Sequence, residues 1–367
     1  MHPNNLSSAL KGVKVLYLGD QFSSYTARLL HDLGASVTKL VSDSYVPAAH
    51  EKHYLAGIAV EQGEATPSRI ASADVIINSP TSGQGWPVLN AEAIKEAHQQ
   101  NPRQVIATIT PYGMTGPWAG RPASDLTLLA AGGFLGSCGY DDGEEAGMPV
   151  APTGGQANHV AGMLATIAIL AQLSKLQAND DTVSEPLDIS VQHALSVSTE
   201  MAIPYWDYTG REVERHTGRH AMPVKTAKWQ HKAADGKFFL ALPLYVDDKR
   251  YATFRQWMRD EGFASVVESD DLAEESYRNQ HQPEMVDQFS ELVRNRNTGW
   301  LFTEGQRRRL PWAPINTADE CIQDSHFTDA RTTIEEIDGI RRARSPFLIQ
   351  SAQGAQGSRT EPDDKEK

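Results

Sequence analysis

The polar residues best placed for chemistry stand in the segment GGQANHVAG (154–162), where Asn158 and His159 precede a long apolar run. An asparagine at a helix entrance is typical of an N-cap, whose side chain accepts a backbone N–H and contributes about 1 kcal/mol. A histidine in the first helical turn is a candidate general base, because imidazole changes its charge near neutral pH. The pattern favours an N-cap role for Asn158 and ordinary packing for His159, with general-base chemistry as the alternative.

Two aspartates in short polar contexts are further candidates. Asp125 belongs to the segment PASDL, and Asp235 stands in ADGKFF. A carboxylate can act as nucleophile or base, although an Asp that precedes a Gly is more typical of a turn.

The two cysteines, Cys138 and Cys321, lie far apart and form no CxxC pair. The sequence therefore favours neither a disulfide framework nor a zinc site, and we expect no metal.

Composition restricts the classes of protein that this chain can belong to. The sequence has 367 residues, of which 40% are hydrophobic, and a formal net charge of −13. This length suits more than one domain, and the acidic balance argues against nucleic-acid binding, which normally needs a basic face. The basic run at 307–309 is more typical of a solvated face or a local anion contact.

The chain shows no sign of export or of membrane insertion. Its N-terminal residues lack a basic start followed by an apolar block, so we expect no secretory signal and a cytoplasmic location. The longest apolar run, 160–173, is interrupted by Thr166 and Gln172 and is shorter than the roughly 20 residues that span a bilayer. It predicts a buried core helix.

The first part of the chain alternates strand and helix patterns. A largely apolar run that ends in glycine is typical of a parallel strand covered on both faces, and the helical spacing between such runs favours a doubly wound, Rossmann-like α/β sheet. No GxGxxG follows the first strand, where the sequence reads GDQFSS (19–24), so we expect no dinucleotide. The predicted strands are 13–19, 35–41, 73–79 and 103–113.

The rest of the chain divides by composition. A glycine-rich stretch (132–155) precedes a helix over about 159–175, and LDISVQHAL (187–195) starts as a strand and turns helical. Later a strand near FFLALPLY and helices around 248–262 and 285–304 predict a smaller α+β domain. We therefore expect a large domain over 1–200 and 335–350, a linker over 201–224, a small domain over 225–334 and a disordered tail over 351–367.

Several blocks together resemble one known family. LKGVKVLYLG and LLHDLGASVTKL resemble the opening strand, helix and second strand of the class III CoA-transferases, the formyl-CoA transferase and carnitine CoA-transferase type. YGMTGPWAGRPASDL (112–126) is similar to that family's Gly-x-x-Gly-Pro turn and its following Asp. The blocks LDISVQHAL, ADGKFFLAL and PWAPINTADECIQDSHFTDAR follow in the family's order, so the resemblance spans roughly residues 10–348.

The resemblance implies a Rossmann-like large domain, a small α/β domain and two subunits threaded through each other like links of a chain. It implies exchange of coenzyme A between an acyl-CoA and a small carboxylic acid through an aspartate that attacks the thioester. That aspartate lies four residues ahead of a glycine; here Gly162 fills the glycine position, and Asn158 fills the aspartate position. A neutral amide is a poor nucleophile, so we expect the covalent route to be blocked in this chain.

Binding of the CoA phosphates is also expected to be weakened. Family members carry basic segments around the third strand, whereas this chain reads NSPTSGQGW after it and HEKHYLAGIAVEQG before it. Lys39 and Lys52 remain as candidate phosphate contacts. The remaining cofactor-binding candidates are Tyr112, Gly113, Gly132 and Gly133; the glycines could form a loop that closes over the reactive intermediate, or serve as turn and close-packing positions.

Different functions remain open. In the first, the chain is a degenerate subunit of a CoA-transferase, paired with itself or with a homologous chain that supplies the aspartate. Alternatively it is a self-sufficient racemase, isomerase or lyase that uses Asp125 and His159, or an acyl-CoA-binding protein without catalysis. The racemases of this superfamily resemble the chain less well, because Ser124 replaces their histidine and Asn158 their aspartate.

Overall fold

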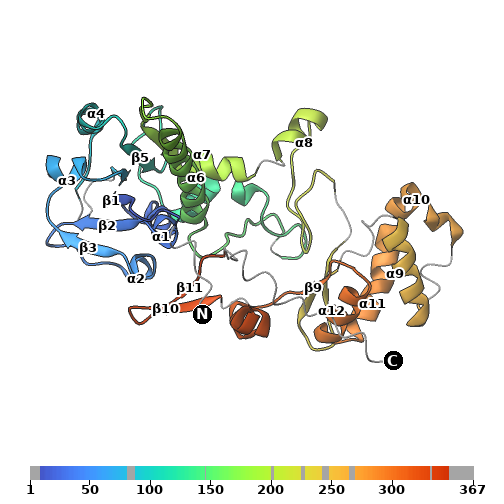
Figure 1. Cartoon of the computed structure of the whole chain (residues 1–367). Coiled ribbons are helices and arrows are strands. Elements are labelled where there is room, and N and C mark those ends of the chain that lie inside the picture. Colours follow the sequence, from blue (N-terminus) through green and yellow to red (C-terminus); the bar gives the residue numbers. More distant parts are fainter. Residues whose placement is uncertain are drawn as a thin grey trace. The chain divides into compact units, whose positions relative to one another are not determined.

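The chain folds into two compact units, which are described separately (Figure 1). Unit 1 falls within Met1–Phe134, Pro152–Glu200 and Ser325–Lys367, and unit 2 within Leu135–Ala151 and Met201–Asp324. Residues 135–151 were expected in the large domain but belong to unit 2, and residues 325–334 were expected in the small domain but belong to unit 1. This computed structural model describes residues 9–80, 87–144, 146–199, 202–224, 228–241, 248–263, 269–330 and 333–346, so the expected tail lies outside the described residues.

Unit 1 is built on a six-stranded sheet in which every neighbouring pair of strands is parallel. The order is β3-β2-β1-β4-β5-β6, which is the strand order of a doubly wound α/β fold. The predicted fold class is therefore confirmed. The strands are β1 (Lys14–Leu18), β2 (Ser36–Val41), β3 (Ala59–Gln62), β4 (Val75–Asn78), β5 (Val105–Thr110) and β6 (Leu187–Ser190).

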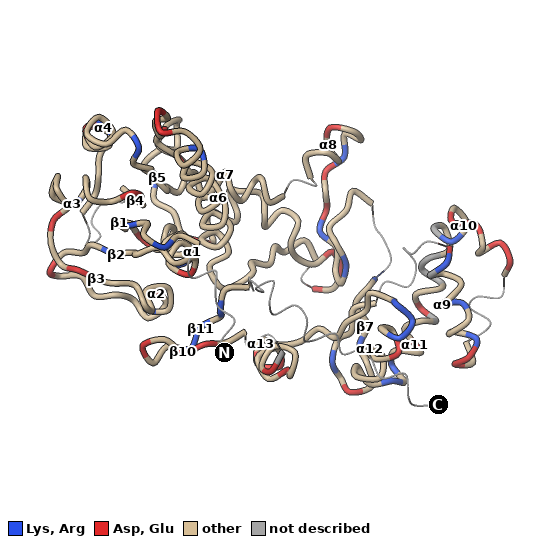
Figure 2. The backbone as a smooth tube through the Cα atoms, in the orientation of Figure 1, with Lys and Arg blue, Asp and Glu red and all other residues tan. Residues whose placement is uncertain are grey.

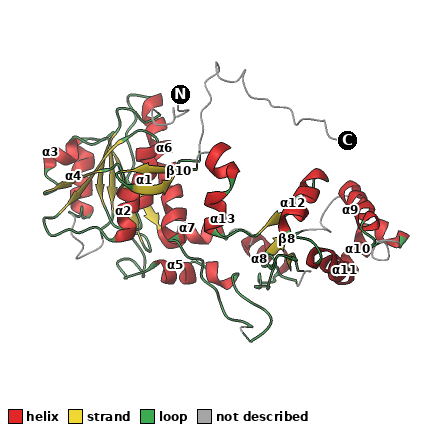
Figure 3. Ribbon diagram, turned by 90° about the horizontal axis from the view of Figure 1, so that it is seen from below, coloured by secondary structure: helices red, strands yellow, loops and turns green. Residues whose placement is uncertain are grey.

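Helices cover both faces of this sheet (Figure 3). On one face, Leu16, Leu40 and Ile76 pack with Ile94 of α4 (Ala91–Gln100) and with Ile70 of α3 (Pro67–Ala71). The other face is covered by α1 (Ser24–Asp32) and α6 (Gln156–Ala178), which contact β2 and β5 respectively. This two-sided burial explains why the central strands read as continuous apolar runs instead of alternating ones.

Helix α6 is longer than the helix predicted over 159–175 and is buried on one face only. Small residues on that face, Ala161, Gly162 and Ala165, pack against its neighbours, whereas Met163 and Ile167 are exposed. By length and composition α6 could cross a membrane, but it packs here against β5, α1, α5 (Asp125–Ala131) and α7 (Val191–Ser198). The prediction of a buried core helix holds for this packed face.

A C-terminal hairpin completes unit 1. Strands β10 (Ile334–Ile337) and β11 (Ile340–Ala343) pair antiparallel, and Arg342 on β11 is buried. Its guanidinium donates to Asp32 at the end of α1, to Glu335 and to the carbonyl of Ala56. The contacts of Arg342 therefore connect the end of the described chain to α1 and to the residue that follows α2 (Ala49–Leu55).

Unit 2 has its own core, in which Phe239, Phe254 and Phe289 surround the buried Trp312. The helix predicted over 285–304 is wrong as a single element: it breaks after Arg294, and Asn297 caps a second helix by accepting from Trp300 N. The elements of unit 2 are α8 (Ala202–Thr209), β7 (Gln230–Lys232), β8 (Phe238–Leu240), α9 (Asp248–Asp260), α10 (Glu275–Gln280), α11 (Gln282–Arg294), α12 (Thr298–Arg307), β9 (Ala313–Pro314) and α13 (Ala318–Gln323), with a short helical turn at Asp270–Ala273. A short helical turn at His326–Ala330 belongs to unit 1, and another at Phe134–Gly136 lies where the chain passes from unit 1 to unit 2.

Candidate active site

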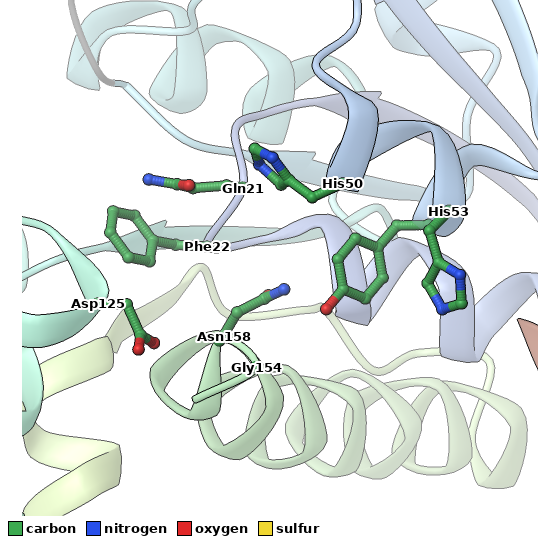
Figure 4. A pocket seen from close by; sticks show the side chains of 9 residues that line it. Gln21, Phe22, His50, His53, Asp125, Gly154 and Asn158 are labelled. Carbon is green, nitrogen blue, oxygen red and sulfur yellow. The ribbon is translucent and has the colours of Figure 1, made fainter. Parts of the chain in front are cut away.

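A pocket of about 440 Å³ opens in unit 1 beyond the carboxyl end of β1 (Figure 4). Open α/β sheets bind ligands at this edge, where the strand order reverses, here between β1 and β4. The loop after β1, helix α2 and the first residues of α5 and α6 form its wall. The lining residues are Gln21, Phe22, His50, His53, Tyr54, Asp125, Gly154, Gly155 and Asn158.

Asn158 is the third residue of α6 and does not cap that helix, so the predicted N-cap role is wrong. The N-cap is Gly155, whose φ of 71° is the left-handed conformation that glycine permits. The Asn158 amide instead reaches the start of α1: its Oδ1 accepts from Tyr25 N at 3.4 Å, and its Nδ2 donates to Ser24 Oγ at 3.1 Å. Since Ser23, the N-cap of α1, makes no side-chain cap bond, Asn158 satisfies an otherwise unpaired helix N–H.

Gly162 permits this contact. A Cβ at Gly162 would lie 2.9 Å from Tyr25 Cβ and 3.1 Å from Thr26 N. Any larger residue would therefore push α6 away from the first turn of α1. Gly162 lies one helical turn after Asn158 on the same face of α6. Its lack of a side chain lets α6 approach α1 closely enough for the Asn158 amide to bond to Ser24 and Tyr25.

Asp125 provides the cap that α6 lacks. It is the first residue of α5, where Ser124 is the N-cap and forms a capping box with Thr127. The Asp125 Oδ1 accepts from Ala157 N at 2.8 Å, in the first turn of α6. The carboxylate lines the pocket and holds a helix end at the same time, so the structure brings Asp125 and Asn158 together.

His159 lies beside the pocket and is half-buried. Its Nε2 lies 2.9 Å from Tyr54 Oη, and its ring packs edge-on against Tyr25 with centroids 4.5 Å apart. Burial lowers the pKa of His159; Asp125 opposes this shift, and His53 adds to it. The imidazole is therefore mainly neutral at pH 7, which is the form that accepts a proton.

The two candidate lysines differ in position. Lys39 on β2 is 0% exposed: its Nζ donates to Glu51 Oε1 and to the carbonyl of Gly19, both at 2.8 Å, and lies 4.3 Å from the ring centre of Tyr17. Burial lowers its pKa, and Glu51 opposes that shift. A buried ammonium held by a carboxylate offers no surface to a CoA phosphate. Lys52 on α2 is exposed and stays a candidate.

The remaining predicted cofactor residues are not among those that line this pocket. Gly113 has φ of 87° in the turn after β5, and the next amide, Met114 N, donates to Asp188, while the ring of neighbouring Tyr112 packs edge-on against Trp118. At the end of α5, a Cβ on Gly132 would lie 2.8 Å from Leu195 Cβ, and Gly133 has φ of 85°. These glycines are a close-packing and a turn position respectively.

Asp235, a weaker candidate, lies in unit 2 and serves the turn that its sequence context indicated. Its carboxylate accepts from Lys237 N and from both the amide and the hydroxyl of Thr298. Slight burial would raise the pKa of Asp235, but these hydrogen bonds outweigh that effect and lower the pKa. The residue connects the β7–β8 turn to α12.

Sequence reasoning missed most of the residues that line this pocket. His50, His53 and Tyr54 have the i, i+3, i+4 spacing that places side chains on one face of a helix, and α2 presents them to the pocket. Gln21 follows the first strand, at the edge where ligands bind. These two signals were available in the sequence. Among the described residues, no group of three His, Cys, Asp or Glu side chains could hold a metal.

The fold is shared with solved structures. A CaiB/BaiF family protein from Brucella suis has a TM-score of 0.75 at 21% identity, covering 94% of this chain and 93% of that one. A Mycobacterium tuberculosis protein has a TM-score of 0.72 at 17% identity, with 93% of each chain covered. The chain therefore shares the fold of these solved structures, one of which is a CaiB/BaiF family protein.

The chain belongs to CoA-transferase family III, whose model matches residues 59–364. It is 27% identical over 232 residues to a subunit of succinyl-CoA:(R)-benzylsuccinate CoA-transferase from Thauera aromatica, covering 62% of this chain but only 54% of that subunit. It is 24% identical to a succinate–glutarate CoA-transferase from Agrobacterium fabrum, covering 94% and 90%. A third relative, the beta subunit of a Chloroflexus aurantiacus succinyl-CoA–L-malate CoA-transferase, is 24% identical over 70% of this chain and 58% of its own length.

Proposed function

We propose that this chain is a subunit of a CoA-transferase that exchanges coenzyme A between an acyl-CoA and a small carboxylic acid, and that a homologous chain supplies the nucleophilic aspartate. The observation that carries the proposal is Asn158: it lines the pocket at the position where the family resemblance expects that aspartate. Both ends of its amide are bound by α1, and an amide forms no mixed anhydride. The family membership and the two relatives named as subunits support it.

An exposed apolar surface supports assembly with a partner. The outer face of α6 carries Met163, Leu164 and Ile167, and Ile167 is 61% exposed. Lys175 is the only charged residue of α6, which appears almost entirely tan in Figure 2. Such an apolar surface is typical of protein–protein contacts. We assign to it the partner subunit, a homologous chain or a second copy, in an interlocked arrangement within the cytoplasm.

The test compares the purified chain with the chain co-expressed with a homologue that has the aspartate. We expect CoA exchange only from the co-expressed complex, and exchange at an ordinary enzymatic rate by the chain alone would contradict the proposal. Calorimetric titration of CoA onto each form shows whether this pocket contributes to binding.

The variant Asn158→Asp tests the position itself. Its carboxylate would accept from Tyr25 N and lie at the positive end of the α1 dipole, so it would be ionised and nucleophilic. After addition of an acyl-CoA, we expect intact-protein mass spectrometry to show a covalent CoA thioester that the parent chain and the matched Asn158→Ala variant lack. If the variant binds CoA but forms no adduct, residue 158 does not stand at the position of the nucleophile.

The Tyr54–His159 pair favours a second candidate function, proton transfer on a bound acyl-CoA without a covalent intermediate. A mainly neutral imidazole hydrogen-bonded to a tyrosine at the pocket could act as a base. Turnover by the chain alone that is lost in His159→Gln, and unaffected by Asn158→Ala, would favour this function over CoA exchange.

A further inference from the structure

Helix α2 has little apolar packing of its own. Of its seven residues, all within the described part of the chain, Leu55 alone is buried, although the helix presents His50, His53 and Tyr54 to the pocket. Short helices are normally held in place by the burial of an apolar face. The position of this pocket wall therefore depends largely on polar contacts.

A second wall of the pocket, the loop after β1, is held by its own hydrogen bonds. The carbonyl of Asp20 accepts from Tyr17 Oη at 2.7 Å, and the Asp20 carboxylate accepts from Phe22 N at 2.9 Å. Gln21 and Phe22 of this loop line the pocket, and in Figure 4 the loop and α2 border the same space. The loop thus offers a firm point to which α2 can be attached.

Lys39 on β2 joins these two walls. Its Nζ donates to the carbonyl of Gly19, at the start of the loop, and to Oε1 of Glu51, in the first turn of α2, both at 2.8 Å. The Lys39 side chain is 0% exposed and that of Glu51 is 12% exposed, so water competes little for either bond. One ammonium is therefore bonded to the loop and to the helix at the same time.

We propose that Lys39 is a positioning residue, whose buried ammonium ties the amino-terminal half of α2 to the loop after β1 and thereby fixes the separation of two walls of the pocket. Arg342 holds the other end of the helix, where it donates to the carbonyl of Ala56 at 3.0 Å. Loss of Lys39 should therefore free the end that carries His50. The inference concerns the shape of the pocket, and only the CoA titration that tests it rests on the proposed function.

Hydrogen exchange in the ligand-free, full-length chain, followed by mass spectrometry, tests this tie directly. In Lys39→Met we expect the amides of α2 to exchange at least about tenfold faster, the effect of losing a hydrogen bond between charged groups. The amides of α4 and α6 should keep the parent rate, because a residue that only added stability would speed exchange throughout unit 1. Unchanged exchange in α2, or equal acceleration in all three helices, would overturn the proposal.

Two further variants separate positioning from charge and from stability. Lys14→Met is the matched control, since it removes an exposed lysine from the neighbouring strand β1; we expect parent exchange in α2, and acceleration equal to that of Lys39→Met would overturn the proposal. The double variant Lys39→Met/Glu51→Met also removes the carboxylate that loses its cation, so stability should return toward the parent value. We expect α2 to stay loose there, because methionine cannot replace the directional bond to Gly19. Parent-like protection of α2 would overturn the proposal, so the test survives a single variant that does not fold.

Calorimetric titration with CoA gives the functional readout. We expect Lys39→Met to bind CoA about fivefold or more weakly than the parent chain, because a loosened wall has to be ordered again on binding. Lys14→Met should bind as the parent does. Equal CoA affinity in the parent and in Lys39→Met would overturn the role of Lys39 in shaping the pocket. A parent chain that binds no CoA would count against the proposed function alone, since hydrogen exchange decides the role of Lys39 without a ligand.

Discussion

At the residue scale, the site depends on two helix ends capped by residues from elsewhere. Asn158 of α6 satisfies Tyr25 N of α1, and Asp125 of α5 satisfies Ala157 N of α6. The sequence identified Asn158 and Asp125 as candidate site residues, but it predicted that Asn158 caps the helix to which it belongs. Tyr25 and Asn158 are 133 residues apart, so no local pattern could show that the amide serves a different helix.

Gly162→Ala tests the close approach of α1 and α6. The new methyl group would overlap Tyr25 Cβ, and overpacking of this kind costs about 1–3 kcal/mol. Equilibrium denaturation should show that loss. The control is Gly299→Ala in α12, where the nearest atom would be 3.6 Å away and the helix should gain stability, by roughly 0.4–1 kcal/mol. Equal stability of Gly162→Ala and the parent chain would contradict the packing argument.

At the element scale, prediction succeeded where burial leaves a pattern. The central strands β1, β2, β4 and β5 were each predicted, because they are mostly buried and carry mainly apolar residues. Strand β3 (AVEQ) was missed because all four of its residues are exposed at the sheet edge. The break between α11 and α12 was missed because Val293 and Trp300, on either side of it, are seven residues apart and so keep the helical spacing. The polar segment RNRNTG (294–299), which includes the capping residue Asn297, marks the break.

The β10–β11 hairpin gives a prediction at this scale. Arg342→Met should cost about 3–5 kcal/mol, since it leaves Asp32 buried with one cationic partner fewer. The control is Arg341→Met, on the exposed side of the same strand, which should change stability by less than about 0.5 kcal/mol. Chemical denaturation measures both, and similar losses in the two variants would contradict a specific role for Arg342.

The same hairpin should loosen in acid. Burial alone would raise the pKa of Asp32, but His31, Arg28 and Arg342 outweigh it and hold the pKa below the ordinary value of 3.8. A depressed carboxyl pKa adds stability that is complete above the unfolded value and is lost as pH falls through the folded value. Limited proteolysis should therefore cut near residues 338–339 faster below about pH 4, and an unchanged rate would contradict this reading.

At the scale of the whole molecule, the apolar face of α6 is the surface that we propose contacts a partner subunit. Ile167→Glu places a charge on that face and should move the assembly toward monomer in sedimentation velocity, without unfolding unit 1. The control is Val183→Glu, at a site 51% exposed in the loop between α6 and β6, which should leave the mass unchanged. A parent chain that sediments as a monomer even with its homologue would contradict the assigned partner surface.

Because the β10–β11 hairpin is translated after nearly all of unit 2, unit 1 is completed last during synthesis. Arg342 and Asp32, which bond to each other, are 310 residues apart, and nearly all of unit 2 is translated between the strands of the sheet and the hairpin. At ~5–20 residues per second, the ribosome needs about 7–29 s to translate the segment between β6 and β10. Throughout this time, the carboxylate of Asp32 lacks Arg342, and the nascent sheet must persist without the hairpin. Mutations that slow translation or folding of unit 2 should therefore lower the yield of unit 1.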